Sequence, residues 1–232
     1  DIQTLNDYDH ALGTAVTHQN WSVDGDRLYV RIEHARGTAA GGRVQAYDVG
    51  TGEPLTQYDA PPSPDGGSSY WGYLAVEDGV IYGGTGNNDH KVNWGWGTYD
   101  SNKLFSESTS LFAMDAETGD VIWRYDARHS IRHNAIAMGN GRIYLIAPPV
   151  AEMDRKTSRS YAHSPADHPY GTLVCLNAVS GDVIYRKRGD IYGTLLVYSA
   201  ADDILVMTYQ FTRFPLASEF GGRMSGFRGA DG

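Results

Sequence analysis

The sequence lacks three features that would each have placed the protein in a familiar class. It contains one cysteine among 232 residues, so no disulfide can form within the chain. No stretch approaches the roughly 18 uncharged apolar residues that a membrane-spanning helix needs. No segment sustains the 3.6-residue apolar period of an amphipathic helix. The sequence therefore predicts neither a disulfide framework, nor a membrane span, nor a helical fold.

Positive charge is also scarce. The chain has 19 Lys and Arg against 28 Asp and Glu, which gives a formal net charge of −9. Binding to a nucleic-acid backbone requires clustered cations, so nucleic acid is excluded as the main partner. Apolar residues make up 41% and charged residues 20% of the chain, which is the composition of a globular protein with a core.

Glycine and aromatic residues are abundant instead. The chain has 28 Gly and 12% aromatic residues, and 16 of these aromatics are Tyr. Many glycines and aromatics without long helix-forming runs are typical of an all-β protein built from short strands and tight turns. The single thiol, Cys175, follows an apolar alternation and is predicted to be a core residue.

A unit recurs along the chain. The segments Gly41–Ala60, Ser110–Ala127 and Gly171–Gly189 each contain a strand, an Asp or Asn, a short turn ending in Gly and a second strand. The segment Gly221–Gly232 contains the first strand and the turn of a fourth copy. The turn glycines lie 67, 62 and 51 residues apart, and variation of this size belongs in connecting loops.

A second pair of strands precedes each of these hairpins, so the unit has four antiparallel strands, A to D. Four-stranded sheets repeated around an axis form a β-propeller, and a solenoid of antiparallel hairpins is the alternative. We expect one all-β domain over residues 1–232, a β-propeller of about three and three-quarter blades that is a portion of a larger propeller. The expected blades are residues 14–60, 70–127, 133–189 and 194–232, the last incomplete.

The turns carry a motif that is predicted to hold neighbouring blades together and to take no part in chemistry. The most complete copy reads A-x-D-x-x-T-G-x-x-x-W, with Asp115, Thr118, Gly119 and Trp123. The Asp can accept hydrogen bonds from turn N–H groups, and Gly can take the left-handed conformation. The Trp is predicted to lie across to the adjacent blade and to bury up to about 250 Å². The matching residues are Asp48, Gly52 and Thr56 in the first copy and Asn177, Gly181 and Tyr185 in the third.

From about Asp24 to Gly232, these repeats resemble the pyrroloquinoline-quinone (PQQ) type β-propeller family, in which this turn is called the tryptophan-docking motif. The family includes calcium- and PQQ-dependent alcohol dehydrogenases as well as non-enzymatic scaffolds of outer-membrane protein assembly. The resemblance therefore implies the propeller fold and a periplasmic or extracellular location, and it leaves the activity open.

The sequence departs from the pattern of the dehydrogenases. Those enzymes typically carry a vicinal disulfide beside the quinone, whereas Cys175 is alone, and their calcium-ligating Glu/Asn/Asp set cannot be identified here. His129 and His133 have zinc-ligand spacing only if they lie on a helix, so no metal site is predicted. We expect a non-catalytic scaffold or binding module with no assigned cofactor. The alternative is part of a dehydrogenase propeller that binds PQQ with calcium.

Loop lengths indicate which face would bind a partner. In a four-stranded blade the B–C and D–A connections emerge on one face, and the long B–C connections, Gly86–Thr109 and Pro148–Tyr170, are rich in aromatic and histidine residues. A protein partner or a small polar ligand would use such a face. A structural alternative is that these side chains only hold the loops and satisfy their carbonyls. The candidate binding residues on the D–A connections are Trp71, Arg132, His133 and Asn134.

Closure of a four-bladed ring is the alternative to a portion of a larger propeller. Gly232 aligns with Gly119, so Asp1–Thr4 could supply the missing outer strand of the last blade. In that alignment Thr4 stands where Trp123 is the docking aromatic. For this reason we expect the larger propeller.

Overall fold

The computed structural model describes residues 21–32, 42–63, 66, 69–86, 107–147, 171–193, 195–209 and 223–232. The proposed closing segment Asp1–Thr4 lies outside the described residues. So do residues 87–106 and 148–170, which form most of the two long connections.

The strands form three four-stranded sheets and one three-stranded sheet, each antiparallel and in chain order. The first sheet contains β1 (Trp21–Asp24), β2 (Arg27–Ile32), β3 (Arg43–Asp48) and β4 (Pro54–Tyr58). The second contains β5 (Trp71–Glu77), β6 (Val80–Gly86), β7 (Glu107–Asp115) and β8 (Val121–Arg132). The third contains β9 (Ile136–Gly139), β10 (Arg142–Ala147), β11 (Thr172–Asn177) and β12 (Val183–Arg188). The fourth contains β13 (Leu195–Ser199), β14 (Ile204–Thr208) and β15 (Met224–Arg228).

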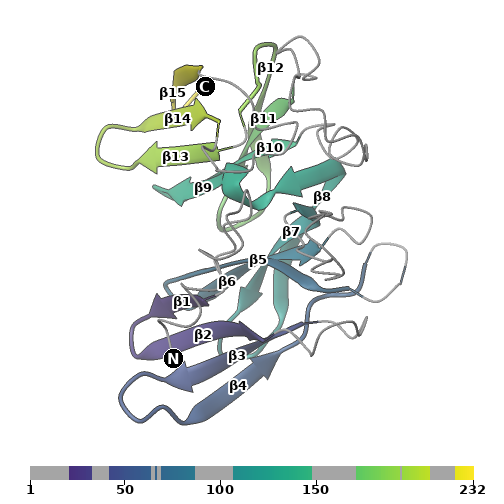
Figure 1. The fold of residues 1–232 in the computed structure, drawn as a ribbon, viewed down its shortest axis with the longest axis vertical. Helices are drawn as coiled ribbons and strands as arrows, with labels where there is room; N and C mark the ends of the chain where they lie inside the picture. Colours follow the sequence, from purple (N-terminus) through teal and green to yellow (C-terminus); the bar gives the residue numbers. More distant parts are fainter. Residues whose placement is uncertain are drawn as a thin grey trace, which may run out of the picture.

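These sheets confirm the predicted fold class of four-stranded antiparallel propeller blades. Figure 1 shows them following one another along the long axis, from β1–β4 at one end to β13–β15 at the other. The first strands of neighbouring sheets contact each other, β1 with β5 and β9 with β13. Among the described residues, no helix has the length and apolar character to span a membrane.

The second sheet extends further than the blade boundary at residue 127 that the repeat suggested. β8 continues to Arg132, because a register shift between Ser108 and Ser110 lets Glu107 pair with Arg132. The 3-10 turn η1 (His133–Ala135) then leads directly into β9. The chain therefore passes from the second sheet to the third through a very short connection.

A polar side chain fixes the turn between the third and fourth strands of each complete sheet. In the second sheet the Asp115 carboxylate accepts hydrogen bonds from the N–H groups of Glu117 and Thr118, each at 2.8 Å. These bonds, that from Thr118 first, hold the pKa of Asp115 below its usual value. The turn closes at Gly119, which has φ +79°, a conformation that side chains with a Cβ rarely adopt.

An aromatic side chain of each outer strand reaches the equivalent turn of the next sheet. In all three junctions it donates a hydrogen bond to the backbone carbonyl of the second residue of that turn. The bonds are Tyr58 Oη to Ala116 O at 2.5 Å, Trp123 Nε1 to Ala178 O at 2.9 Å and Tyr185 Oη to Gly229 O at 3.2 Å.

The first junction uses a residue that the motif alignment did not select. Thr56 occupies the position of Trp123 but is exposed, whereas Tyr58, two residues further along β4, is 2% exposed. Successive side chains of a strand alternate between its faces, so residues two apart share a face. Tyr58 therefore projects toward the second sheet, as Trp123 projects toward the third.

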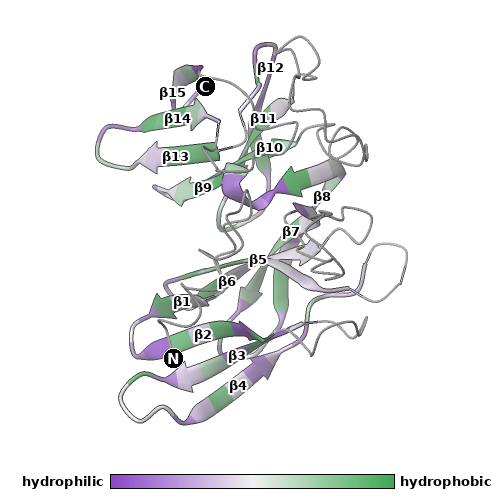
Figure 2. Ribbon diagram, viewed as in Figure 1, coloured by the Kyte–Doolittle hydropathy of each residue, from purple (hydrophilic) through white to green (hydrophobic). Residues whose placement is uncertain are grey.

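Apolar side chains fill the spaces between neighbouring sheets. Trp123 belongs to a cluster with Leu111 of its own sheet and with Ile143 and Leu176 of the third sheet. Similar clusters lie at the other two junctions. Figure 2 shows hydrophobic residues along β10 and β11 and hydrophilic ones along the outer strand β12. The core is thus divided into layers, one at each junction.

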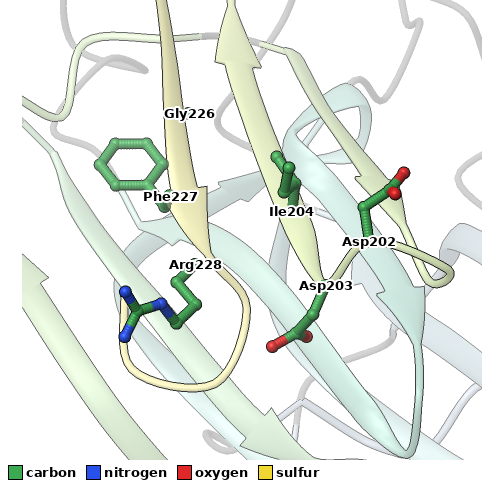
Figure 3. A pocket seen from close by; sticks show the side chains of 6 residues that line it. All are labelled: Asp202, Asp203, Ile204, Gly226, Phe227 and Arg228. Atoms are coloured by element: carbon green, nitrogen blue, oxygen red, sulfur yellow. The ribbon is translucent and has the colours of Figure 1, made fainter.

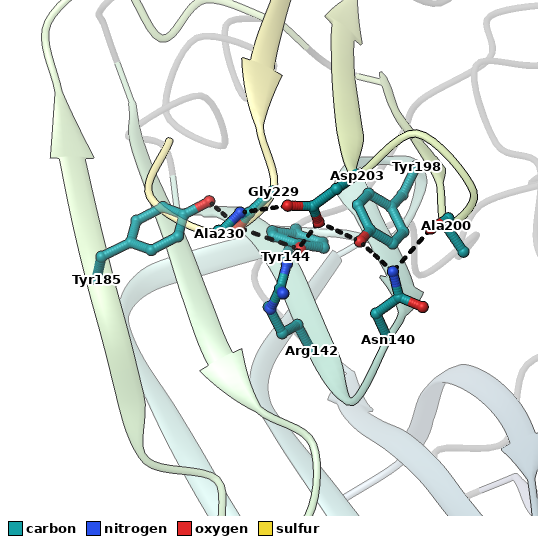
Figure 4. Close-up of polar contacts among 9 residues, drawn as sticks. All are labelled: Asn140, Arg142, Tyr144, Tyr185, Tyr198, Ala200, Asp203, Gly229 and Ala230. Atoms are coloured by element: carbon teal, nitrogen blue, oxygen red, sulfur yellow. Dashed lines mark hydrogen bonds and ion pairs between the residues drawn. The ribbon is translucent and has the colours of Figure 1, made fainter.

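A polar network adds to the junction between the third and fourth sheets (Figure 4). The Asp203 carboxylate accepts hydrogen bonds from Tyr198 Oη and Arg142 Nη1, each at 2.6 Å, and from the Ala230 N–H at 3.1 Å. The Tyr198 hydrogen bond and then the Arg142 guanidinium hold the pKa of Asp203 below its usual value. Since Arg142 begins β10 and Asp203 precedes β14, the network joins the two sheets at the turn end.

Trp123→Ala should lower the free energy of unfolding by about 3–5 kcal/mol, the usual cost of deleting a buried large aromatic. The control is Ile122→Ala on the same strand, because Ile122 is 50% exposed. The control should change stability by less than about 1 kcal/mol. Denaturant melts measure both. Equal effects of the two substitutions would contradict a docking role for Trp123.

Gly181→Ala should destabilise the protein more than Gly52→Ala. Both glycines have φ +74°, so the backbone cost of a Cβ is the same. A Cβ on Gly181 would lie 2.7 Å from the Trp123 ring, whereas one on Gly52 meets nothing within 4 Å. Overpacking of this kind costs about 1–3 kcal/mol. Thermal melts of the two variants measure the difference. Equal melting temperatures would contradict close packing of the Trp123 ring against Gly181.

Candidate functional site

Several polar side chains gather where the second sheet meets the connections of the binding face proposed from the sequence. They come from the start of β7, the end of β8 and η1, with one arginine from the end of β2, and they surround the backbone at the start of β5. These strand ends adjoin the B–C and D–A connections. The described residues of this rim are Arg31, Gly72, Glu107, Ser108, Arg132 and His133.

A hydroxyl–imidazole pair lies at the centre of the rim. Ser108 Oγ is 2.8 Å from His133 Nε2, and which of the two donates depends on the histidine tautomer. Ser108 is fully buried and His133 is 6% exposed. A Cβ on Gly72 would lie 2.4 Å from Ser108 Oγ and 2.8 Å from His133 Nε2, so only glycine fits there. The hydrogen bond joins η1 to β7, and Gly72 of β5 lies close against both side chains.

A buried ion pair lies beside it. Arg132 Nε is 3.7 Å from Glu107 Oε1, and the side chains are 1% and 0% exposed. The two residues are cross-strand partners at the ends of β7 and β8. Opposite charges buried together compensate part of the large desolvation cost that each would bear alone. Glu107 therefore faces a guanidinium, and Arg132 is not presented to solvent.

Arg31 joins the first sheet to the same rim. Its Nη1 atom donates a hydrogen bond of 2.6 Å to the Gly72 carbonyl, and Arg31 is 5% exposed. The bond runs from the end of β2 to the start of β5. The buried Arg31 guanidinium thus fixes the backbone at Gly72, against which the Ser108 and His133 side chains pack.

The structure brings two of the four predicted binding residues together. Arg132 and His133 lie side by side in the rim, and Asn134 follows them in η1, half-buried. Trp71 begins β5 but lies in the core between the first and second sheets. Its Nε1 atom donates to the Tyr58 carbonyl at 3.1 Å, and its ring packs edge-on against Phe112. Trp71 is 1% exposed and offers no open aromatic surface.

An open hollow lies elsewhere on the described surface. It has a volume of about 330 Å³ and lies at the ends of β14 and β15, in the fourth sheet (Figure 3). Its lining residues are Asp202, Asp203, Ile204, Gly226, Phe227 and Arg228. None of the four predicted binding residues lines it. Within the described part of the chain, no three His, Cys, Asp or Glu side chains are close enough to hold a metal ion.

Sequence reasoning missed Arg31, Glu107 and Ser108. One of them left a usable signal, because Arg31 interrupts the apolar alternation of Arg27–Ile32 on the face that also carries Tyr29. A charged residue on the inward face of a strand needs a partner. Glu107 and Ser108 stand at the end of a long connection, where the sequence does not reveal the register that pairs Glu107 with Arg132.

Comparison with known proteins gives a family match. A family model described as outer membrane protein assembly factor BamB matches residues 40–232. No curated protein sequence matches the chain.

The chain also resembles solved structures at low sequence identity. BamB from Moraxella catarrhalis is 14% identical, covering 90% of this chain and 45% of its own, with a TM-score of 0.45. A europium-containing methanol dehydrogenase is 13% identical over 90% of this chain and 39% of its own, with a TM-score of 0.49. Quinohemoprotein alcohol dehydrogenase from Comamonas testosteroni is 15% identical over 83% and 29%, with a TM-score of 0.46. The chain spans less than half the length of each.

Arg132→Met should destabilise the protein by about 3–5 kcal/mol, because it leaves the Glu107 carboxylate buried without its guanidinium. The double variant Arg132→Met with Glu107→Leu should be more stable than Arg132→Met alone, since the carboxylate that had lost its guanidinium is then also removed. Denaturant melts of the two single variants and the double variant complete the cycle. Costs that simply add would contradict a direct ion pair.

Proposed function

The chain belongs to the PQQ-like β-propeller family, and from this membership and the rim geometry we propose that it is a non-catalytic scaffold that binds a protein partner outside the cytoplasm. The partner binds on the face where the B–C and D–A connections emerge. The alternative occupant of this face is a small polar ligand. The family model is described as an outer-membrane protein assembly factor, which supports a protein partner.

One observation carries the non-catalytic part of the proposal. The groups of the rim that could do chemistry are buried and bonded within the rim itself. Ser108 is 2.8 Å from His133, and Glu107 is paired with Arg132. A nucleophile or general base must reach the proton or atom on which it acts. Buried groups that fasten strands to one another support a structural role, so binding would use the connections around them.

A dehydrogenase that uses PQQ with calcium is the alternative function. The described residues do not fit that cofactor well. The carboxylate of the rim, Glu107, is buried against Arg132 and not open to a cation. The vicinal disulfide that resemblance to these enzymes implies does not lie within these 232 residues, which contain one cysteine. Cys175 is itself buried, and burial raises the pKa of its thiol to about 11. We therefore assign no cofactor.

Site-specific crosslinking tests which face binds. A photoreactive group is attached to a cysteine placed at Asn134, on the binding face, or at Val179, which is 78% exposed on a turn of the opposite face. The buried Cys175 should not react, so the unsubstituted chain is the labelling control. With an envelope extract of the source organism, Asn134→Cys should give a single discrete adduct and Val179→Cys none. Adducts from Val179→Cys alone would place binding on the other face and contradict the proposal.

Cofactor binding separates the two functions. PQQ and Ca²⁺ are added to the full-length protein that contains these residues, and quinone binding and alcohol-dependent dye reduction are measured. The scaffold function predicts no saturable quinone binding and no dye reduction. Saturable binding of PQQ that requires Ca²⁺ would favour the dehydrogenase.

A further inference from the structure

The outer strand β12 of the third sheet carries two arginines on one face. Tyr185 and Lys187 donate side-chain hydrogen bonds to carbonyls of the turn after β15, so they face the fourth sheet. Side chains alternate along a strand, so Arg186 and Arg188 project from the opposite face, and both are exposed. Residues two apart on a strand have Cα atoms roughly 7 Å apart. β12 therefore presents two neighbouring guanidinium groups to solvent.

The first two sheets have a carboxylate where β12 has its second arginine. Counted from the turn glycine, Arg188 is equivalent to Asp59 in the first sheet and to Asp126 in the second. Asp59 Oδ1 lies 2.9 Å from Arg43 Nε. Asp126 Oδ1 lies 2.7 Å from Arg124 Nε. The outer positions of these two sheets thus neutralise their own cations, whereas the third sheet has a second cation in place of the carboxylate.

The two arginines of β12 also have no partner elsewhere in the described part of the chain. No hydrogen bond or ion pair involves the side chain of Arg186 or Arg188. Most other described arginines are bonded through their side chains, among them Arg31, Arg132, Arg142 and Arg223. The chain has 28 Asp and Glu against 19 Lys and Arg, so carboxylates are plentiful. The lack of one beside Arg186 and Arg188 is a property of this strand and not of the composition.

The backbone of β12 has an edge that a further strand can join. β12 is the outermost strand of a complete four-stranded sheet and pairs with β11 alone among the described residues (Figure 1). Its pairing is regular from Tyr185 to Arg188, so its outward N–H and C=O groups are aligned as in an ordinary strand edge. Cations on an edge keep unsuitable strands away. Opposite charges on facing strands attract, so this edge favours an acidic strand and repels a basic one.

We propose that the edge of β12 binds an acidic extended segment of a partner polypeptide. The segment pairs with the backbone of β12 and places two acidic residues, two positions apart, opposite Arg186 and Arg188. Main-chain hydrogen bonds supply affinity in this mode of recognition, and alternate side chains supply specificity. A guanidinium can bind a carboxylate through two parallel hydrogen bonds, which sets the register of the segment. The site runs along the outer side of the third sheet, so it stands independently of the proposed function.

A short peptide with this spacing is the probe. Fluorescein-labelled Val-Thr-Glu-Thr-Glu-Thr-Val has both carboxylates on one face, whereas Val-Thr-Glu-Glu-Thr-Thr-Val has the same composition with the carboxylates on opposite faces. Fluorescence anisotropy measures binding to the full-length protein that contains these residues. The first peptide should bind saturably and at least about threefold more tightly than the second. Replacing both Glu by Lys should weaken binding at least about tenfold, because like charges then face each other.

Substitutions of exposed arginines locate the peptide on the protein. Arg188→Asp introduces the residue found at the equivalent position of the first two sheets and should weaken binding at least about tenfold. Arg43→Asp makes the same change of net charge on the first sheet and should alter binding less than about twofold, since salt screens distant charges. Arg186→Glu with Arg188→Glu should reverse the preference, so that the Lys peptide binds. These side chains are exposed, so thermal melts should show every variant folded.

Pairing of the two backbones has a separate test. In an added strand, alternate residues direct their N–H groups to the neighbouring strand, and the residues between them direct theirs away. Two versions of the Glu peptide are prepared, one N-methylated at its Thr residues and one at its Glu residues. One of them should bind at least about tenfold more weakly than the unmethylated peptide, because it cannot donate to β12. The other should bind like the unmethylated peptide.

Four results would overturn the proposal. They are no saturable binding, equal binding of the Glu and Lys peptides, binding that Arg188→Asp leaves unchanged, and equal binding of the two methylated peptides. The first is the result expected if the arginines only keep other strands away, and the last is expected of a purely electrostatic encounter. None of these results bears on the crosslinking from Asn134, so failure here and failure of the proposed function can be told apart.

Discussion

One kind of contact recurs at all three junctions between the described sheets: an aromatic side chain of an outer strand lies over the turn of the next sheet and donates a hydrogen bond to a carbonyl of that turn. The turn must be held rigid for the carbonyl to be in place, which the Asp115 or Asn177 side chain does. The turn must also end in a residue that tolerates positive φ and has no Cβ. At Gly181 both requirements meet, because the Trp123 ring lies against it. The small residue Ala113, the cross-strand partner of Trp123 on β7, leaves room beside it for the ring.

Much of the fold could be predicted from the sequence because these requirements are local. A turn that needs Asp or Asn, then Gly, with alternating apolar residues on either side, leaves a recurring pattern in the chain. The exchange of Thr56 for Tyr58 was not predictable from the motif alone. Two positions on the same strand face can each reach the neighbouring turn, and which one does so depends on how the two sheets pack.

The rim was harder to predict because its partners come from distant parts of the chain. Arg132 and His133 could be named as polar residues of a short connection. Their partners Glu107 and Ser108 could not, since a register shift in β7 decides which residues face them. Trp71 could be named from the sequence, but its surroundings could not: it was a candidate binding residue and it lies in the core. An aromatic residue at the start of a strand is compatible with a ligand surface and with a core, and only the position of Phe112 and Tyr58 decides between them.

The junctions are also directional, because the surface that gives the aromatic differs from the surface that receives it. Such a contact is heterologous: it joins unlike surfaces, so one sheet can always be followed by another. Repeated heterologous contacts build a closed ring when the rotation per unit divides a full turn, and an open helical filament when it does not. The geometry between sheets, and not the chemistry of the contact, therefore decides whether an array of these repeats is finite.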